Sequence, residues 1–211
     1  MEYYEDEEEY REIAPLLRRI QSQNEQLKQD QKEIEKAALI RQEFTANVSH
    51  ELKTPLHAIS GYWEDCDLYR IAENAVDSLE VAATALGVEV TVEGSDATIR
   101  AIPQLIYSIV YNLCDNAIKY NHSGGSVQVR VQQTSYNIVL SIKDTGIGIP
   151  EESRERIFER FYRVDKSRSK EVGGTGLGLS IVKHAVIIHN GKIEVKSKLG
   201  EGTEMIITLP K

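Results

Sequence analysis

Residues 44–61 read FTANVSHELKTPLHAISG, and this stretch places a histidine on a helix face that apolar side chains leave uncovered. At about 100° per residue, its apolar positions form one stripe, namely Phe44, Val48, Leu52, Pro55 and Ile59. His50 points roughly 200° away from the centre of that stripe, so burial does not account for it. Glu51 follows directly, and Thr54 lies one turn further along on the same side. An exposed imidazole beside a carboxylate is either a nucleophile whose proton the carboxylate removes or an ordinary surface histidine.

The order of residues in this stretch favours the first alternative. Residues 44–56, FTANVSHELKTPL, resemble the phosphoacceptor box of sensor histidine kinases. The resemblance implies that His50 accepts the γ-phosphoryl group of ATP, that Glu51 acts as the base, and that Thr54 belongs to the same catalytic box. His57 lies on nearly the same face, but no acid follows it, so we interpret it as a surface residue.

The composition limits the classes of protein to which the chain can belong. Its 211 residues suffice for one or two domains, and its net charge of −8 argues against nucleic-acid binding. The apolar runs are far shorter than a bilayer span, and no signal peptide is recognisable. We therefore expect a soluble, cytoplasmic protein with no membrane segment in this chain. Cys66 and Cys114 fit neither a disulfide framework nor a zinc site.

The N-terminal third of the chain has two parts. Residues 1–13 contain the acidic run EDEEE and are predicted to be a solvated tail, whereas residues 14–61 have a helical pattern. From the end of the tail onward, apolar residues recur at every seventh position, namely Ile13, Ile20, Leu27 and Ile34. That spacing is typical of one coiled-coil position, but the matching second position is a poor fit, with Leu16, Gln23, Asp30 and Ala37. We predict a long helix that forms either a weak coiled coil or only a charged helix.

The rest of the chain mixes helices and strands without a regular alternation. After a linker at 62–67, helices are predicted at 68–86, 103–120 and 177–189, and strands at 88–92, 97–102, 126–132, 137–143, 192–197 and 203–209. Strand 97–102 is expected to pair with strand 88–92, and a loop with one short helical piece is expected between residues 144 and 176. This pattern favours an α+β fold in which a long N-terminal helix precedes a two-layer sandwich, a mixed sheet with helices on one face.

Polar residues and glycines recur at four places in this second part. Asn112, Asn116 and Lys119 form one polar stripe on an otherwise apolar helix, which either holds a ligand or satisfies its amides within the fold. In DTGIGI (144–149), Asp144 can accept a hydrogen bond from an exocyclic amine, and the glycines allow a close backbone approach, although such a motif also marks ordinary turns.

The other two places lie nearer the C-terminus. The sequence GGTGLG (173–178) leads into a helix whose N–H groups can hold phosphate, but it lacks the lysine of a P-loop. The sequence GEGTE (200–204) contains Thr203 and turns the chain back along the sheet.

Together with FERFY (158–162), these stretches resemble, in order and spacing, the boxes of the GHKL-type (Bergerat) ATP-binding domain of histidine kinases. The resemblance covers residues 67–211 and implies that Asn116 holds Mg²⁺, that Asp144 binds the adenine amine, and that residues 174–178 form a hinge and phosphate cradle. The complete ATP-binding set that it implies is Asn112, Asn116, Lys119, Tyr120, Asp144, Gly146, Gly148, Phe158, Phe161, Gly174, Thr175, Gly176, Leu177, Gly178 and Thr203.

One departure from the family concerns the dimerisation hairpin. Members have two helices per chain there, but Gly61 is followed by only six residues before the ATP-binding domain, residues 68–211, begins. The resemblance implies a protein-histidine kinase that relays phosphate to the receiver domain of a response regulator and forms a homodimer through its N-terminal helix. A regulatory ATP-binding module with little autokinase activity is the alternative. An ATPase of the chaperone and topoisomerase group is a third, which the phosphoacceptor box argues against.

Overall fold

The computed structural model describes residues 19, 23, 26, 62–164 and 175–211. The chain divides into two units, Met1–Val48 and Ser49–Lys211. In the first unit the described residues are Arg19, Gln23 and Gln26, and each of them is helical. The long helix predicted at 14–61 lies otherwise outside the described residues.

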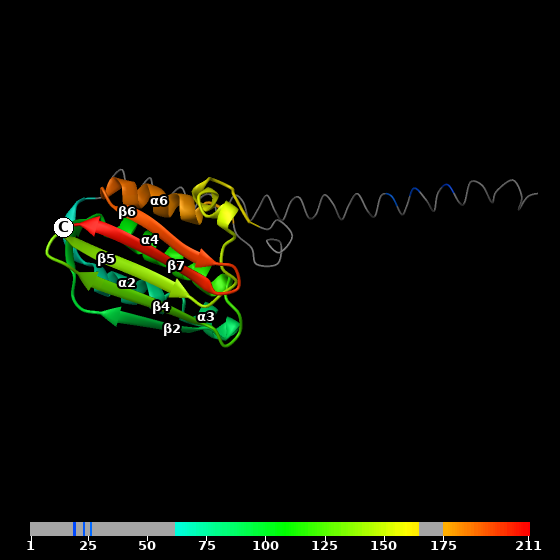
Figure 1. Cartoon of the computed structure of the whole chain (residues 1–211), viewed down its shortest axis with the longest axis horizontal. Coiled ribbons are helices and arrows are strands. Elements are labelled where there is room, and N and C mark those ends of the chain that lie inside the picture. The colour runs from blue at the N-terminus through cyan, green and yellow to red at the C-terminus, as the bar shows by residue number, and fades with distance from the viewer. Residues whose placement is uncertain (1–18, 20–22, 24–25, 27–61, 165–174) are drawn as a thin grey trace, which may run out of the picture. The chain divides into compact units, whose positions relative to one another are not determined.

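The second unit contains a five-stranded mixed sheet (Figure 1). Its strands, in spatial order, are β2 (Glu89–Gly94), β4 (Ser126–Gln133), β5 (Asn137–Asp144), β7 (Gly202–Pro210) and β6 (Lys192–Lys198). The pair β2–β4 is parallel, and the other three pairs are antiparallel. The predicted C-terminal hairpin, β6–β7, is confirmed.

Helices cover one face of this sheet. The helices are α2 (Leu68–Asp77), α3 (Glu80–Leu86), α4 (Pro103–Lys119) and α6 (Gly178–Ile188). The central helix, α4, begins with proline at its first turn, which suits a residue without an N–H group. Alternate residues of β4 and β5, including Val129 and Leu140, point to the same face and are buried in the core, and α4 packs against both strands. The predicted two-layer α/β sandwich is confirmed.

The strand pairing predicted for residues 88–102 is wrong. Strand β2 pairs with β4, whereas β3 (Thr98–Ala101) pairs with β1 (Glu64–Asp67) in a separate two-stranded sheet. The side chain of Asp67 fixes this arrangement, because its Oδ1 accepts hydrogen bonds from the N–H groups of Tyr69 and Ala97, each at 3.0 Å. Part of the predicted linker at 62–67 is therefore a strand that pairs within the sandwich.

The single helix predicted at 68–86 is interrupted. Helix α2 ends at Asp77, and Ser78 Oγ donates a hydrogen bond to the carbonyl of Asn74 at 2.8 Å while accepting one from Tyr107 at 3.0 Å. Such a side-chain bond back to the preceding turn competes with helix continuation. Helix α3 ends at Leu86, the last residue of the predicted helix, and Gly87 follows with a left-handed φ of 65°.

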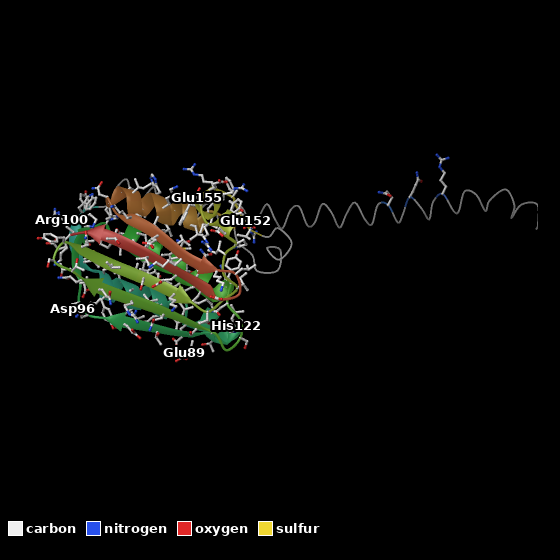
Figure 2. All side chains as sticks on the ribbon, in the orientation of Figure 1. Glu89, Asp96, Arg100, His122, Glu152 and Glu155 are labelled. Atoms are coloured by element: carbon white, nitrogen blue, oxygen red, sulfur yellow. The ribbon has the colours of Figure 1, made fainter. Side chains whose placement is uncertain are left out.

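The described residues between β5 and α6 contain two short 3-10 helices, η1 (Glu151–Ser153) and η2 (Arg156–Phe158), where one helical piece was expected. Figure 2 shows Glu152 and Glu155 in this segment, beside α6. Within the described ranges, no helix combines the length and the apolar character that crossing a bilayer requires.

Candidate active site

Asp144 lies at the end of β5, and two backbone N–H groups hold its carboxylate. Its Oδ1 atom accepts hydrogen bonds from Gly146 at 2.8 Å and from Thr203 at 3.2 Å. Burial raises the pKa of the Asp144 carboxyl, and the two N–H groups offset part of that rise. Because both donors use Oδ1, the other oxygen has no partner among the described residues and can accept from a ligand.

The turn after Asp144 approaches its neighbours backbone to backbone. A Cβ atom on Gly146 would lie 2.3 Å from the carbonyl oxygen of Tyr120, and one on Gly148 would lie 2.1 Å from that of Lys198. The Tyr120 carbonyl also accepts a hydrogen bond from the N–H of Ile147 at 3.0 Å. The backbone of Tyr120 therefore shapes this turn. Gly146 and Gly148 are required because a side chain at either position would clash with a neighbouring carbonyl oxygen.

The polar residues of α4 differ in whether their side chains have hydrogen-bond partners within the fold. Asn112 Nδ2 donates to the carbonyl and the hydroxyl of Ser108 at 2.8 and 3.2 Å, and Lys119 Nζ lies 2.6 Å from Asp115. The half-buried Asn116 side chain has no hydrogen-bond partner within the described part of the chain. Asn116 is thus the amide whose donor and acceptor groups both remain available.

Asn112 also faces the start of α6. A Cβ atom on Gly178, the first residue of α6, would lie 2.7 Å from Asn112 Oδ1. At this end of α6, Thr175 Oγ1 accepts a hydrogen bond from the N–H of Leu177 at 3.3 Å. The structure thus brings the N-terminus of α6 next to the polar stripe of α4, as a phosphate site at both elements requires.

Phe158 and Phe161 play different structural roles. Phe158 packs against the core, and Lys183 Nζ lies 5.9 Å from its ring centroid. Phe161 is 59% exposed, its φ is 63°, and its N–H donates to the carbonyl of Gly176 at 2.9 Å. A left-handed backbone at an aromatic residue is uncommon and costs energy, so the contact with Gly176 is part of what maintains it.

Thr203 belongs to a hydroxyl network with Ser197, a residue that the sequence motifs did not indicate. Its Oγ1 lies 2.9 Å from Ser197 Oγ, which also donates to the carbonyl of Gly202 at 2.9 Å and accepts from the N–H of Ile149 at 2.8 Å. A signal existed, because Ser197 is the polar member of an inward-facing series with Ile193 and Val195 on β6. A hydroxyl at such a position needs partners.

These contacts place the predicted residues in linked groups. One contains Asp144, Gly146, Thr203 and the Tyr120 backbone; a second contains Asn112 and Gly178; and a third contains Phe161 and Gly176. His122, shortly after α4, lies at the end of the sheet where β5 finishes, whereas Asp96 and Arg100 lie at the opposite end (Figure 2). His50, Glu51, Thr54 and Gly174 lie outside the described residues.

Two family models match the chain. The model described as "Histidine kinase-, DNA gyrase B-, and HSP90-like ATPase" matches residues 101–211, and the "His Kinase A (phospho-acceptor) domain" matches residues 40–81. The first match covers more than half of the chain and includes α4, the Asp144 turn, α6 and the Thr203 strand.

Known proteins agree with these matches. The chain is 32% identical to the sensor-like histidine kinase SenX3 of Mycolicibacterium smegmatis over 232 residues, which is 86% of this chain and 60% of SenX3. The chain therefore spans about three fifths of that relative's length.

Solved structures share the fold. The mycobacterial sensor histidine kinase MprB superposes with a TM-score of 0.61 and 31% identity over 71% of this chain and 97% of that one. Full-length ShkA in complex with AMPPNP gives a TM-score of 0.62 and 27% identity over 70% of this chain and 31% of that one.

One family accounts for the α/β sandwich and for both family-model matches. The chain belongs to the sensor histidine kinase family of two-component systems.

Proposed function

We propose that this protein is an ATP-dependent protein-histidine kinase that phosphorylates His50 and passes the phosphoryl group to an aspartate of a response regulator. In the first step, an imidazole nitrogen bonds to the γ-phosphorus, the bond from that phosphorus to the bridging oxygen breaks, ADP leaves, and Glu51 takes the imidazole proton. Such a transfer depends mainly on positioning and electrostatics. The observation that carries the proposal is the Asp144 carboxylate with one oxygen open to a ligand, in a chain that also contains a phosphoacceptor match.

The Asp144 end of the site fits an adenine base. An ionised carboxylate accepts hydrogen bonds and cannot donate them, so its open oxygen suits the exocyclic amine of adenine. The backbone-to-backbone contacts at Gly146 and Gly148 keep the surrounding turn compact. Asp144 would therefore select the base, while Asn112, Lys119 and the start of α6 would face the phosphates.

Asn116 fits a role as a Mg²⁺ ligand. Mg²⁺ prefers oxygen ligands and commonly binds through one or two protein groups together with substrate phosphates and water. The described residues contain no group of three His, Cys, Asp or Glu side chains that could hold a metal ion. An available amide oxygen beside nucleotide phosphates is consistent with an ion that is held mainly by the nucleotide.

Two observations support a missing second dimerisation helix. The phosphoacceptor match extends to residue 81, yet β1, α2 and the first residues of α3 lie within its second half, and α2 packs against α4 in the sandwich. The alignment with SenX3 spans 232 residues, which exceeds the 211 of this chain, so the relative carries residues that this chain lacks. We propose that the first helix forms a homodimer contact without its usual hairpin partner.

Incubation with γ-labelled ATP and Mg²⁺ tests the proposal. Label that is lost in acid and stable in alkali identifies a phosphohistidine. The label should disappear in His50→Gln and persist in His57→Gln, because an acid follows His50 and not His57. Transfer to a receiver domain should then remove the label from the kinase.

Each other outcome contradicts the kinase proposal in a recognisable way. ATP binding without any label would favour a regulatory module, and release of phosphate without label would favour an ATPase. Label that persists in His50→Gln and is lost in His57→Gln would identify His57, not His50, as the phosphoacceptor.

A further inference from the structure

The Ser197 hydroxyl is fully used in hydrogen bonding. It has one hydrogen, which it donates to the carbonyl of Gly202 at 2.9 Å, and it accepts from the N–H of Ile149 at 2.8 Å. Its contact with Thr203 Oγ1 at 2.9 Å therefore has Thr203 as the donor. A serine hydroxyl offers one donor and two acceptor sites, and all three are occupied here.

These partners lie on the two segments that hold Asp144. Thr203 itself donates its N–H to Asp144 Oδ1, and Gly202 precedes it. Ile149 ends the turn that begins after Asp144 and contains the second donor, Gly146. Ser197 is thus hydrogen-bonded to both segments, although its own side chain does not contact the carboxylate.

We infer that Ser197 is a positioning residue that directs the open oxygen of Asp144 toward the exocyclic amine of the base. This inference rests on the proposed ATP-binding function. The two N–H donors on Oδ1 fix the rotation of the carboxylate, and Ser197 fixes the segments that carry those donors. Small displacements of a supporting group are sufficient to misplace a hydrogen-bonding partner.

A merely structural role for Ser197 makes a different prediction from a positioning role. If the hydroxyl only satisfies the half-buried N–H of Ile149, its loss lowers the stability of the sandwich and weakens the binding of all nucleotides equally. If it directs Asp144, its loss reduces the preference for a base that carries an amine. The preference between two nucleotides therefore separates the two roles.

The experiment uses the full chain with Ser197→Thr and Ser197→Val. Threonine and valine have nearly the same shape, but threonine keeps the hydroxyl. Calorimetry would measure the Kd values of ATP and of inosine triphosphate, in which a carbonyl oxygen replaces the amine, both with Mg²⁺. Ser141→Val provides the control, because Ser141 is a serine on β5 that lies outside the hydroxyl network.

The wild type, Ser197→Thr and Ser141→Val should all prefer ATP. In Ser197→Val the ratio of the two Kd values should fall by about tenfold, which is the change in affinity expected when one hydrogen bond to a charged group is lost. An unchanged ratio of the two Kd values in Ser197→Val would overturn the inference while leaving ATP binding intact. A wild-type protein that binds neither nucleotide would instead overturn the proposed function, and this inference with it.

A second variant covers the case in which Ser197→Val does not fold. Thr203→Val keeps the shape of Thr203 and its backbone N–H but removes the hydroxyl that donates to Ser197. Its preference for ATP should also decrease, whereas an unchanged preference would count against the network. Thermal melting without nucleotide would establish that each variant is folded.

Discussion

At the scale of single residues, Asp144 makes the strongest prediction about the site. Replacement by alanine removes the acceptor that we propose for the adenine amine. ATP affinity should fall by about 1–3 kcal/mol, the cost of losing a hydrogen bond to a charged group and leaving its partner unsatisfied. Calorimetry on Asp144→Ala would measure this change directly.

Asp96→Ala is the matched control for this measurement. Asp96 is exposed and lies at the end of the sheet opposite to His122 (Figure 2). Its replacement should leave the ATP affinity at the wild-type value. Equal affinities in Asp144→Ala and Asp96→Ala would exclude Asp144 from base binding.

His189 is a buried residue outside the site, and it predicts how stability depends on pH. Its Nε2 accepts a hydrogen bond from the N–H of Ile102 at 3.1 Å, so Nδ1 carries the proton and donates to the carbonyl of Ala185 at 2.7 Å. Trp63 covers the ring, with centroids 5.0 Å apart. Burial lowers the pKa of His189 from 6.5, and the bond to Ala185 offsets part of the decrease.

The sign of the pH effect follows from this lowered pKa. The unfolded chain takes up a proton near pH 6.5, whereas folded His189 does so only at a lower pH. The contribution of neutral His189 to stability is therefore fully present above pH 6.5 and is lost as the pH falls from there through the lowered pKa of the folded state. His189→Gln cannot titrate, so the decrease in its unfolding free energy below pH 6.5 should be smaller than in the wild type.

Urea denaturation at a series of pH values would measure this difference. His184→Gln is the control, because His184 is an exposed histidine on the same helix, α6, and should keep the wild-type slope. Identical slopes for the wild type and His189→Gln would show that His189 is not responsible.

At the scale of elements, β1 predicts that residues 64–67 contribute to the stability of the sandwich. Asp67 caps α2 and also binds the N–H of Ala97, which precedes β3. Asp67→Ala should lower the free energy of unfolding by about 1–3 kcal/mol, because one helix cap and a second hydrogen bond are lost. Asp67→Asn keeps the acceptor oxygen and should be close to the wild type. Urea unfolding of both variants tests this, and no loss in Asp67→Ala would favour a free linker.

Elements whose signals are local could be predicted from the sequence. Helix α4 begins at a proline and has a strong apolar face, and α3 stops at a left-handed glycine. The C-terminal hairpin was likewise indicated by alternation on both sides of a glycine-rich turn. In each case the residues that decide the structure lie inside the element or directly beside it.

Features that depend on distant partners could not be predicted in this way. Strand β3 follows β2 closely but pairs with β1, and the Asp67 side chain that connects them is 30 residues from Ala97. The break at Ser78 involves Tyr107 on another helix. The same limit applies to the site: the motifs indicated Asp144 and Thr203, but Ser197 acquires its role only when β6 lies beside the Asp144 turn.

At the scale of the whole molecule, the connection between the two functional parts is shorter than the sequence suggested. A linker of six residues was expected after Gly61, but β1 begins at Glu64, and Trp63 packs against His189. Of the six residues predicted as a linker, only Tyr62 and Trp63 precede this strand.

The predicted first helix supplies the reason to expect a second chain. Its apolar stripe is predicted to continue from Ile40 through Phe44, Val48 and Leu52. If the second hairpin helix is missing, as we propose, no helix of the same chain covers this stripe. Leaving such side chains in water costs roughly 1.5–3 kcal/mol each. We therefore predict self-association through this helix and His50 labelling whose rate per molecule rises with protein concentration.

Sedimentation and single-turnover labelling over one dilution series test this prediction together. The proposed architecture lacks the second hairpin helix that would orient His50, so we expect labelling to be slow even in the associated state. Ile40→Glu places a charge in the stripe about 15 Å along the helix from His50 and should reduce both association and labelling. Arg41→Glu changes charge at the next position, off the stripe, and should leave association at the wild-type level. Two results together would refute the dimer prediction: a chain that stays monomeric at high concentration, and fast His50 labelling at a rate that dilution does not change. One chain would then position its own acceptor without a partner helix.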